Sequence, residues 1–168
     1  MENKKSILFL CTHNSARSQI AEGLVNHFFQ DTWVAFSAGT EISKINPYTL
    51  KIMNEYNIDI SNQYSKHLND FLSKDIDYVV TVCDDANDKC PNFPNAKNRM
   101  HLSLPDPSIY NDNEELAMIK FKEIYEKILN WLNFKLPTME QLQNAFETDA
   151  VQKLNEQNLS KTHKKAIV

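Results

Sequence analysis

Short apolar runs alternate with helical patterns along most of this chain, and this alternation limits the possible folds more than any other feature. Continuous runs rich in strand-forming residues occupy 6–10, 33–37 and 77–82, as is typical of strands buried in a parallel sheet. Apolar residues at helical spacing occupy 18–29 and 113–134, and Asn46-Pro47 is typical of a helix start. We therefore predict an α/β fold, a small parallel sheet of about four strands with helices on both faces.

The length of 168 residues fits one compact domain. The segment after Pro137 differs from the rest, because it ends in the basic cluster Lys161-Thr-His-Lys-Lys165. Before that cluster, one more helix is indicated by apolar residues at helical spacing, namely Leu142, Ala145, Phe146, Ala150 and Leu154. We expect a domain over 1–136 and a C-terminal extension over 137–168, a helix followed by a flexible tail.

Composition excludes several classes of function. Gly23 and Gly39 are the two glycines of the chain, too few for a glycine-rich nucleotide-binding loop. Eighteen Lys and Arg against 22 Asp and Glu give a net charge of −4, so no nucleic-acid partner is expected. No run approaches the roughly 20 apolar residues of a membrane span, and no targeting segment is visible. We expect a cytoplasmic protein with no membrane partner, in which free cysteines are more often catalytic or metal-binding than structural.

The segment Cys11-Thr12-His13-Asn14-Ser15-Ala16-Arg17-Ser18 joins the first predicted strand to the first predicted helix. A loop of this length at a helix N-terminus directs successive backbone N–H groups into one concavity, which binds anions. The forked guanidinium of Arg17 can hold two oxygens of a tetrahedral oxyanion. We expect a lowered pKa for the Cys11 thiol and a hydroxyl donor in Ser18. The alternative is an inert cysteine packed as a small apolar residue.

The longer string Cys-Thr-x-Asn-Ser-x-Arg-Ser-Gln-x-Ala-Glu-Gly over residues 11–23, with Ser-Ala-Gly at 37–39, resembles the low-molecular-weight tyrosine phosphatase superfamily. It is most similar to the thioredoxin-coupled arsenate reductase branch, and the resemblance runs from about residue 6 to about residue 134. It implies that Cys11 attacks arsenate, for which phosphate is an analogue. Cys83 would then attack Cys11 and Cys90 would attack Cys83, leaving a Cys83–Cys90 disulfide for thioredoxin to reduce.

The spacing of Cys83 and Cys90 also bears on a metal site. C-x6-C is not the C-x2-4-C spacing of structural zinc sites, and a lone His101 is more typical of a satisfied core residue. We therefore expect no metal and no cofactor.

If 83–90 were helical, a rise of about 1.5 Å per residue would separate the Cα atoms of Cys83 and Cys90 by about 10 Å. A disulfide spans at most about 7 Å, so the segment would have to unwind on oxidation.

Asp106 lies in Leu104-Pro105-Asp106-Pro107 and matches the general acid of the family. The alternative for this residue is an ordinary turn aspartate between two prolines.

Elsewhere the chain departs from the family pattern. His13 stands where these reductases often have glycine, so this loop residue is bulkier.

Some reductases of this branch bind potassium beside the loop. Three ligands have counterparts in this chain, namely Asn14, Glu22 and Ser37, but the fourth, an aspartate, is replaced by Lys66. We expect the Lys66 ammonium to pair with Glu22 in place of a cation.

Three functions remain open at this point. The first is arsenate reduction through the disulfide cascade. The second is hydrolysis of phosphomonoesters by the same loop through a phosphocysteine, which we expect at least as a side activity. In tyrosine phosphatases aromatic residues follow the Asp-Pro, and here Tyr110 is one candidate only. The third is a non-catalytic redox sensor or anion-binding module, which would need no general acid.

Overall fold

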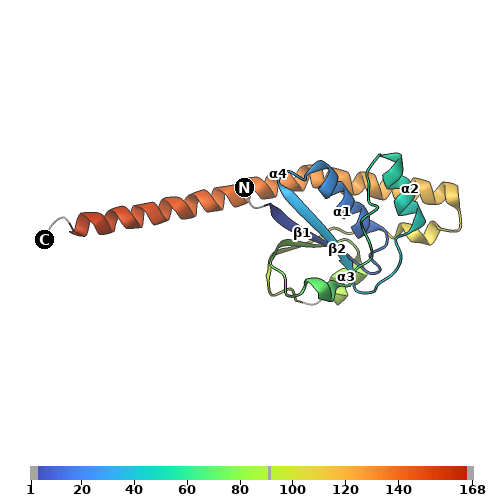
Figure 1. Cartoon of the computed structure of the whole chain (residues 1–168), viewed down its shortest axis with the longest axis horizontal. Coiled ribbons are helices and arrows are strands. Elements are labelled where there is room, and N and C mark those ends of the chain that lie inside the picture. Colours follow the sequence, from blue (N-terminus) through green and yellow to red (C-terminus); the bar gives the residue numbers. More distant parts are fainter. Residues whose placement is uncertain (1–3, 91, 166–168) are drawn as a thin grey trace. The chain divides into compact units, whose positions relative to one another are not determined.

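A computed structural model describes residues 4–90 and 92–165 of the chain. Figure 1 shows the course of its helices and strands. Short 3-10 helices are labelled η. In chain order the elements are β1 (Lys5–Cys11), α1 (Arg17–Phe28), β2 (Trp33–Gly39), α2 (Pro47–Glu55), η1 (Leu68–Phe71), β3 (Ile76–Thr81), α3 (Asp84–Lys89), β4 (Ala96–His101), η2 (Pro107–Tyr110) and α4 (Glu114–Lys165).

The four strands form one parallel sheet in the order β2-β1-β3-β4. This arrangement confirms the predicted fold class. The runs at 6–10, 33–37 and 77–82 correspond to β1, β2 and β3, each shifted or extended by one or two residues. Asn46 caps α2 by accepting a hydrogen bond from the Tyr48 N–H at 2.9 Å, with Pro47 as the first helical residue, as the sequence predicts.

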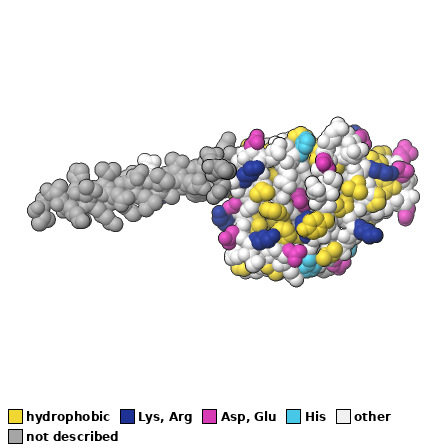
Figure 2. Space-filling model, in the orientation of Figure 1, with side chains coloured by type: hydrophobic (Ala, Val, Ile, Leu, Met, Phe, Trp, Pro, Cys, Tyr) yellow, Lys and Arg dark blue, Asp and Glu magenta, His cyan; other side chains and the backbone are white. Residues whose placement is uncertain are grey.

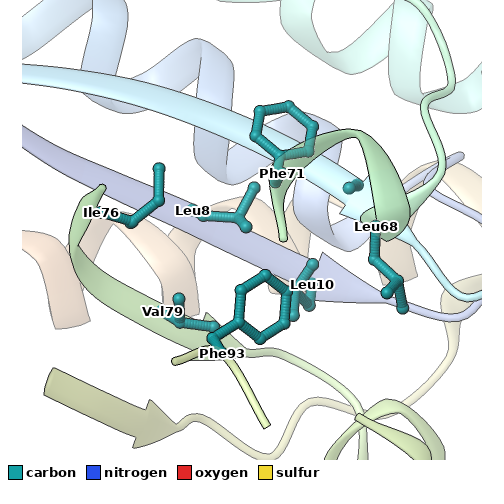
Figure 3. Packing of buried hydrophobic residues seen from close by; sticks show 8 residues of the cluster. Leu8, Leu10, Leu68, Phe71, Ile76, Val79 and Phe93 are labelled. Carbon is teal, nitrogen blue, oxygen red and sulfur yellow. The ribbon is translucent and has the colours of Figure 1, made fainter. Parts of the chain in front are cut away.

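The sheet is buried because its side chains alternate between two apolar layers. Leu8 and Leu10 of β1 pack with Leu68 and Phe71 of η1 and with Phe93 on one face (Figure 3). On the other face α1 packs along β1 and β2. Both layers therefore hold β1 in the centre, and its C-terminal end delivers Cys11 to the edge where β3 and β2 also end.

Helix α4 extends from Glu114 to Lys165, and Pro137 lies inside it. It contains both the helix predicted over 113–134 and the one predicted in the C-terminal segment. The chain divides into two compact units, Met1–Leu129 and Asn130–Val168. The boundary we expect after residue 136 stays a prediction.

The surface carries charges of both signs. On the face shown in Figure 2, Lys and Arg side chains are interspersed with Asp and Glu around small apolar areas. Among residues 4–90 and 92–165, no helix is long and apolar enough to span a bilayer.

Candidate active site

The loop between β1 and α1 is held in place from behind by its neighbours. The Ser15 carbonyl accepts hydrogen bonds from the Asn46 N–H at 2.9 Å and from the Thr49 hydroxyl at 3.0 Å. On the β2 side the backbones touch at Gly39, where an added Cβ would lie 2.5 Å from the Thr12 carbonyl oxygen. The loop is thus shaped by α2 and by the end of β2 before any ligand binds.

Cys11 lies at the base of the loop, where it is 3% exposed. Its Sγ is 2.8 Å from the Ser18 Oγ and accepts a hydrogen bond from the Asn14 N–H at 3.2 Å. The Ser18 Oγ also accepts from the Asn14 amide at 2.8 Å. In the Cys11–Ser18 pair either atom can be the donor, and a Ser18 hydroxyl that donates would stabilise a Cys11 thiolate. The role of Ser18 stays a prediction.

The expected lowering of the Cys11 pKa is not observed. Burial raises the pKa of the Cys11 thiol, and the hydrogen bond from Ser18 and the charge of Arg17 oppose this rise without overcoming it. The sequence pattern indicates the positive groups of the loop, whereas the desolvation of a sulfur at the end of a central strand follows only from the fold. The Cys11 thiolate must therefore form against the cost of its own burial.

Asn14 organises the interior of the loop. Its backbone has a positive φ of 49°, a conformation that asparagine tolerates better than most residues. Its side-chain Oδ1 accepts from the Lys66 N–H at 2.8 Å and from Gln19 Nε2 at 3.0 Å, while its amide donates to Ser18. Gln19 is fully buried and was not singled out from the sequence. Its position directly after Arg17 and Ser18 in the Arg-Ser-Gln string was the signal that could have identified it.

Arg17 and Asp106 approach each other across the mouth of the loop. Arg17 donates from Nη1 to the Leu104 carbonyl at 3.0 Å, and its Nη2 is 3.8 Å from Asp106 Oδ1. That same Oδ1 accepts from the Ser108 N–H and hydroxyl at 3.0 and 2.7 Å, capping η2. An acid proton would therefore be carried on Oδ2, the oxygen turned away from these donors.

The second cysteine lies beside the first because β1 and β3 are neighbours. The Val82 N–H donates to the Leu10 carbonyl at 2.8 Å, so Cys11 and Cys83 leave adjacent strand ends. The Thr12 hydroxyl bridges the two segments, 3.5 Å from Cys83 Sγ and 3.1 Å from Asp85 Oδ2. Cys83 is itself buried, at 3% exposure.

The third cysteine stands at the opposite end of α3. Cys83 caps the start of this helix by accepting from the Ala86 N–H at 3.3 Å, and Cys90 is its C-terminal capping residue. All three cysteines are present as thiols. Residues 84–89 are helical, whereas Cys83 and Cys90 are themselves extended and flank the helix. The unwinding of α3 on oxidation therefore stays a prediction.

Side chains from β3 and β4 fasten α3 to the sheet, and sequence reasoning missed them. The Thr81 hydroxyl donates to Asn87 Oδ1 at 3.1 Å and lies 2.7 Å from His101 Nδ1. His101 Nε2 is 2.8 Å from Asp84 Oδ1, and Arg99 Nη2 donates to the Asn87 carbonyl at 3.1 Å. His101 was expected to be a satisfied core residue, but its side chain is 31% exposed and its hydrogen bonds make it an anchor of α3 instead. Arg99 and His101 lie on the mostly exposed strand β4 and Thr81 is buried in β3, and no local signal indicated that they contact α3.

The loop residue His13 turns away from the concavity. Its Nδ1 is 3.3 Å from Glu41 Oε2, and its side chain is 53% exposed. Ala16, in contrast, is buried and precedes the first residue of α1. The backbone of 11–17 therefore forms the loop, whereas the His13 ring lies outside it beside Glu41.

Lys66 lies beside Glu22, as predicted. Its Nζ is 3.4 Å from Glu22 Oε2 and donates to the Tyr64 carbonyl at 2.7 Å. The Ser37 hydroxyl donates to the same Glu22 oxygen, and Asn14 Oδ1 is already bonded twice. The oxygens that a potassium ion would need are thus engaged by protein donors, and these residues do not fit the ion. Within the described ranges, no group of three or more His, Cys, Asp or Glu side chains could hold a metal ion.

Comparison with known proteins agrees with this geometry. The family model for low molecular weight phosphotyrosine protein phosphatase matches residues 6–146. A protein of Shouchella clausii named arsenate reductase is 43% identical over 126 residues, which cover 75% of this chain and 91% of that one. A Bacillus subtilis protein of the same name is 43% identical over 132 residues, covering 79% and 94%. Among solved structures, the thioredoxin-dependent arsenate reductase of Corynebacterium glutamicum is 32% identical with a TM-score of 0.65, covering 84% of this chain and 64% of that one.

Proposed function

The chain belongs to the low molecular weight phosphotyrosine protein phosphatase family, and we propose that it is an arsenate reductase that thioredoxin regenerates. Its curated relatives carry the name arsenate reductase, and a solved structure like it is described as thioredoxin-dependent. The observation that carries the proposal is the arrangement of its three thiols. One lies in an anion-binding loop, one on the adjacent strand end, and one across a short helix.

The first step uses the loop and Asp106. The Cys11 thiolate attacks arsenic, forming a sulfur–arsenic bond, and one arsenate oxygen leaves as water after taking a proton from Asp106. The N–H groups of Thr12, His13, Asn14, Ser15, Ala16 and Arg17 and the Arg17 guanidinium would hold the remaining oxygens. Arsenic is still in its +5 state after this step.

The reduction occurs in the second step. The Cys83 thiolate attacks Cys11 Sγ, a sulfur–sulfur bond forms, and the electron pair of the sulfur–arsenic bond stays on arsenic, which leaves as arsenite. Adjacent strand ends and the Thr12 bridge support this order, because they bring Cys83 to Cys11 before Cys90. Cys90 then attacks Cys83, and Cys11 leaves as a thiolate. A reductant restores the two thiols.

Phosphomonoester hydrolysis is the second candidate. It would need Cys11, Arg17 and Asp106 but neither of the other cysteines, and arsenate and phosphate share their tetrahedral shape and charge. The site supports it as a side activity of the same loop. A dedicated phosphatase would have no use for a buried Cys83 bridged to the loop by Thr12.

The remaining partners follow from the chemistry. The cascade consumes two thiols in each cycle, so the enzyme requires a dithiol reductant of the thioredoxin class and a reducing compartment, the cytoplasm. We propose no nucleic-acid partner, in keeping with the net charge of −4.

Steady-state arsenate turnover with and without a thioredoxin system, measured beside hydrolysis of an aryl phosphate, tests the proposal. Cys83→Ser and Cys90→Ser are expected to stop multiple-turnover arsenate reduction while leaving ester hydrolysis near the parental rate. Cys11→Ser is the matched variant that must abolish both. Parental arsenate turnover in either Cys83→Ser or Cys90→Ser would contradict the cascade, and ester hydrolysis without arsenate turnover in the parent would favour the phosphatase.

A further inference from the structure

The C-terminal end of α3 has a backbone carbonyl that the helix itself cannot satisfy. In an α-helix the Asn87 carbonyl would accept from the N–H of residue 91. Residue 91 is proline, which has no N–H. Arg99 on the neighbouring strand β4 supplies the donor instead, from Nη2 at 3.1 Å. The guanidinium therefore caps the last turn of α3, the turn that leads into Cys90.

Two features of its surroundings disfavour a thiolate at Cys90. It is partly buried against the apolar cluster that includes Phe93, and it stands at the negative end of α3. Burial raises the pKa of the Cys90 thiol, and the charge of Arg99 lowers it. On α3 itself, Asp84 is bonded to His101, Asp85 accepts from Thr12, and Asp88 is exposed.

We propose that Arg99 is a positioning residue for the resolving thiol Cys90: bonded to the last turn of α3, its guanidinium lies beside Cys90 and supplies the positive charge that a Cys90 thiolate requires before α3 opens. This rests on the proposed function, in which Cys90 acts last. There the Cys90 thiolate attacks Cys83 Sγ, a Cys83–Cys90 bond forms, the Cys83–Cys11 bond breaks, and Cys11 departs as a thiolate. The proton of Cys90 is lost to solvent beforehand.

A role in capping and a role in charge are separable. Lysine at position 99 keeps the charge without the planar fork, whereas glutamine carries no charge and has its donor two side-chain atoms closer to the backbone than the Nη2 that bonds the Asn87 carbonyl. Rescue by lysine therefore reports on the charge. Lys97 is the matched control, because it lies two residues away on β4 and pairs instead with Asp77, at 2.5 Å. Its neutralisation removes the same charge from the same strand.

Alkylation of Cys90 by iodoacetamide, followed against pH, measures its thiolate directly. The full chain carrying Cys11→Ser and Cys83→Ser leaves Cys90 as the one thiol of the three. In this background Arg99→Gln is expected to move the midpoint upward by about half a pH unit, with alkylation roughly threefold slower at neutral pH. Arg99→Lys is expected to restore most of the shift, and Lys97→Gln to leave the midpoint in place.

An unchanged midpoint in Arg99→Gln, or an equal shift in Lys97→Gln, would overturn the proposal. In the otherwise unaltered chain, Arg99→Gln should slow arsenate turnover yet leave aryl phosphate hydrolysis unchanged. The two measurements separate a failure of the Arg99 proposal from a failure of the proposed function. If the parent does not turn over arsenate, the proposed function fails, while the alkylation result still decides whether Arg99 acts on Cys90.

Discussion

Among single residues, Cys11 shows best how opposing interactions set the pKa of one thiol. Burial raises the pKa of its thiol, while Ser18, Arg17 and the Asn14 N–H all favour the thiolate. A charged sulfur in a desolvated pocket depends on each donor more than an exposed one would. The reactivity of Cys11 is therefore expected to respond strongly to the loss of a single hydroxyl group.

Ser18→Ala is expected to raise the pKa of Cys11 further, because the substitution removes a hydrogen bond made to the charged form. The pH midpoint of iodoacetamide alkylation, measured with Cys83→Ser and Cys90→Ser so that Cys11 alone reacts, should move upward. Ser65→Ala is the control, since that hydroxyl donates to the His13 carbonyl on the outside of the loop. Equal midpoints in the parent and Ser18→Ala would contradict the assignment of Ser18 as donor.

Lys66 leads to a second prediction at this scale. With the ammonium beside Glu22, potassium should not raise the Tm of the parent relative to sodium at the same ionic strength, which cancels general screening. Lys66→Asp removes the ammonium and restores a carboxylate, so potassium is expected to raise the Tm of that variant by mass action. Potassium-specific stabilisation of the parent would show that the site accepts the ion despite the lysine.

At the scale of elements, the loop depends on how closely the end of β2 approaches it. A Cβ at Gly39 would lie 2.5 Å from the Thr12 carbonyl oxygen, 2.7 Å from that of Glu41 and 2.9 Å from the Asn14 nitrogen. All three are backbone atoms, so the loop itself would have to move. Gly39→Ala is expected to lower the free energy of unfolding by about 1–3 kcal/mol and to reduce aryl phosphate hydrolysis more than tenfold.

Gly23→Ala is the matched control for Gly39→Ala, with denaturant unfolding and ester hydrolysis measured on both. An added Cβ at Gly23 would meet buried side chains, Met53 Cε at 2.7 Å and Ile60 Cγ2 at 2.8 Å, and not the backbone of the loop. Its effect on hydrolysis should therefore be small. If Gly39→Ala hydrolyses the ester as fast as Gly23→Ala, the contact with β2 does not shape the loop.

Sequence patterns predicted the buried elements better than the exposed ones. Strands β1 and β3 are continuous apolar runs because both faces of the sheet are covered. Strand β4 lies at an edge and reads Ala-Lys-Asn-Arg-Met-His with mostly exposed side chains, so hydrophobic periodicity could not reveal it. Helix α3, Asp-Asp-Ala-Asn-Asp-Lys, likewise has residues of weak helix propensity, Asp and Asn, at four of its six positions. Polar contacts from β3 and β4 hold it instead, and these depend on the fold.

At the scale of the whole molecule, the candidate site is built within the unit Met1–Leu129. Each predicted site residue lies in this unit, whereas α4 continues to Lys165. Its continuation was not predicted, because Pro137 removes an N–H and is usually found near a helix boundary.

A chain that ends after Leu136 is expected to keep its ester hydrolysis and to unfold with the parental midpoint. It retains Leu132 and Leu136, which are fully buried, and all of the proposed catalytic residues. Hydrolysis rates and thermal unfolding of the two chains, measured side by side, check this. A loss of hydrolysis in the shortened chain would show that residues 137–168 contribute to the active site and would move the predicted domain boundary.

Because Cys83 and Cys90 lie at the two ends of α3, each turnover is expected to include the unfolding and refolding of this helix. Helix–coil relaxation takes about 0.1–1 μs even for a peptide of about 20 residues, whereas enzymes commonly complete about 1–1000 cycles per second. This peptide rate is an upper limit for the six residues of α3, because Thr81, His101 and Arg99 also hold this helix in the folded chain. These contacts, rather than helix formation itself, are expected to set how readily α3 opens during the cycle.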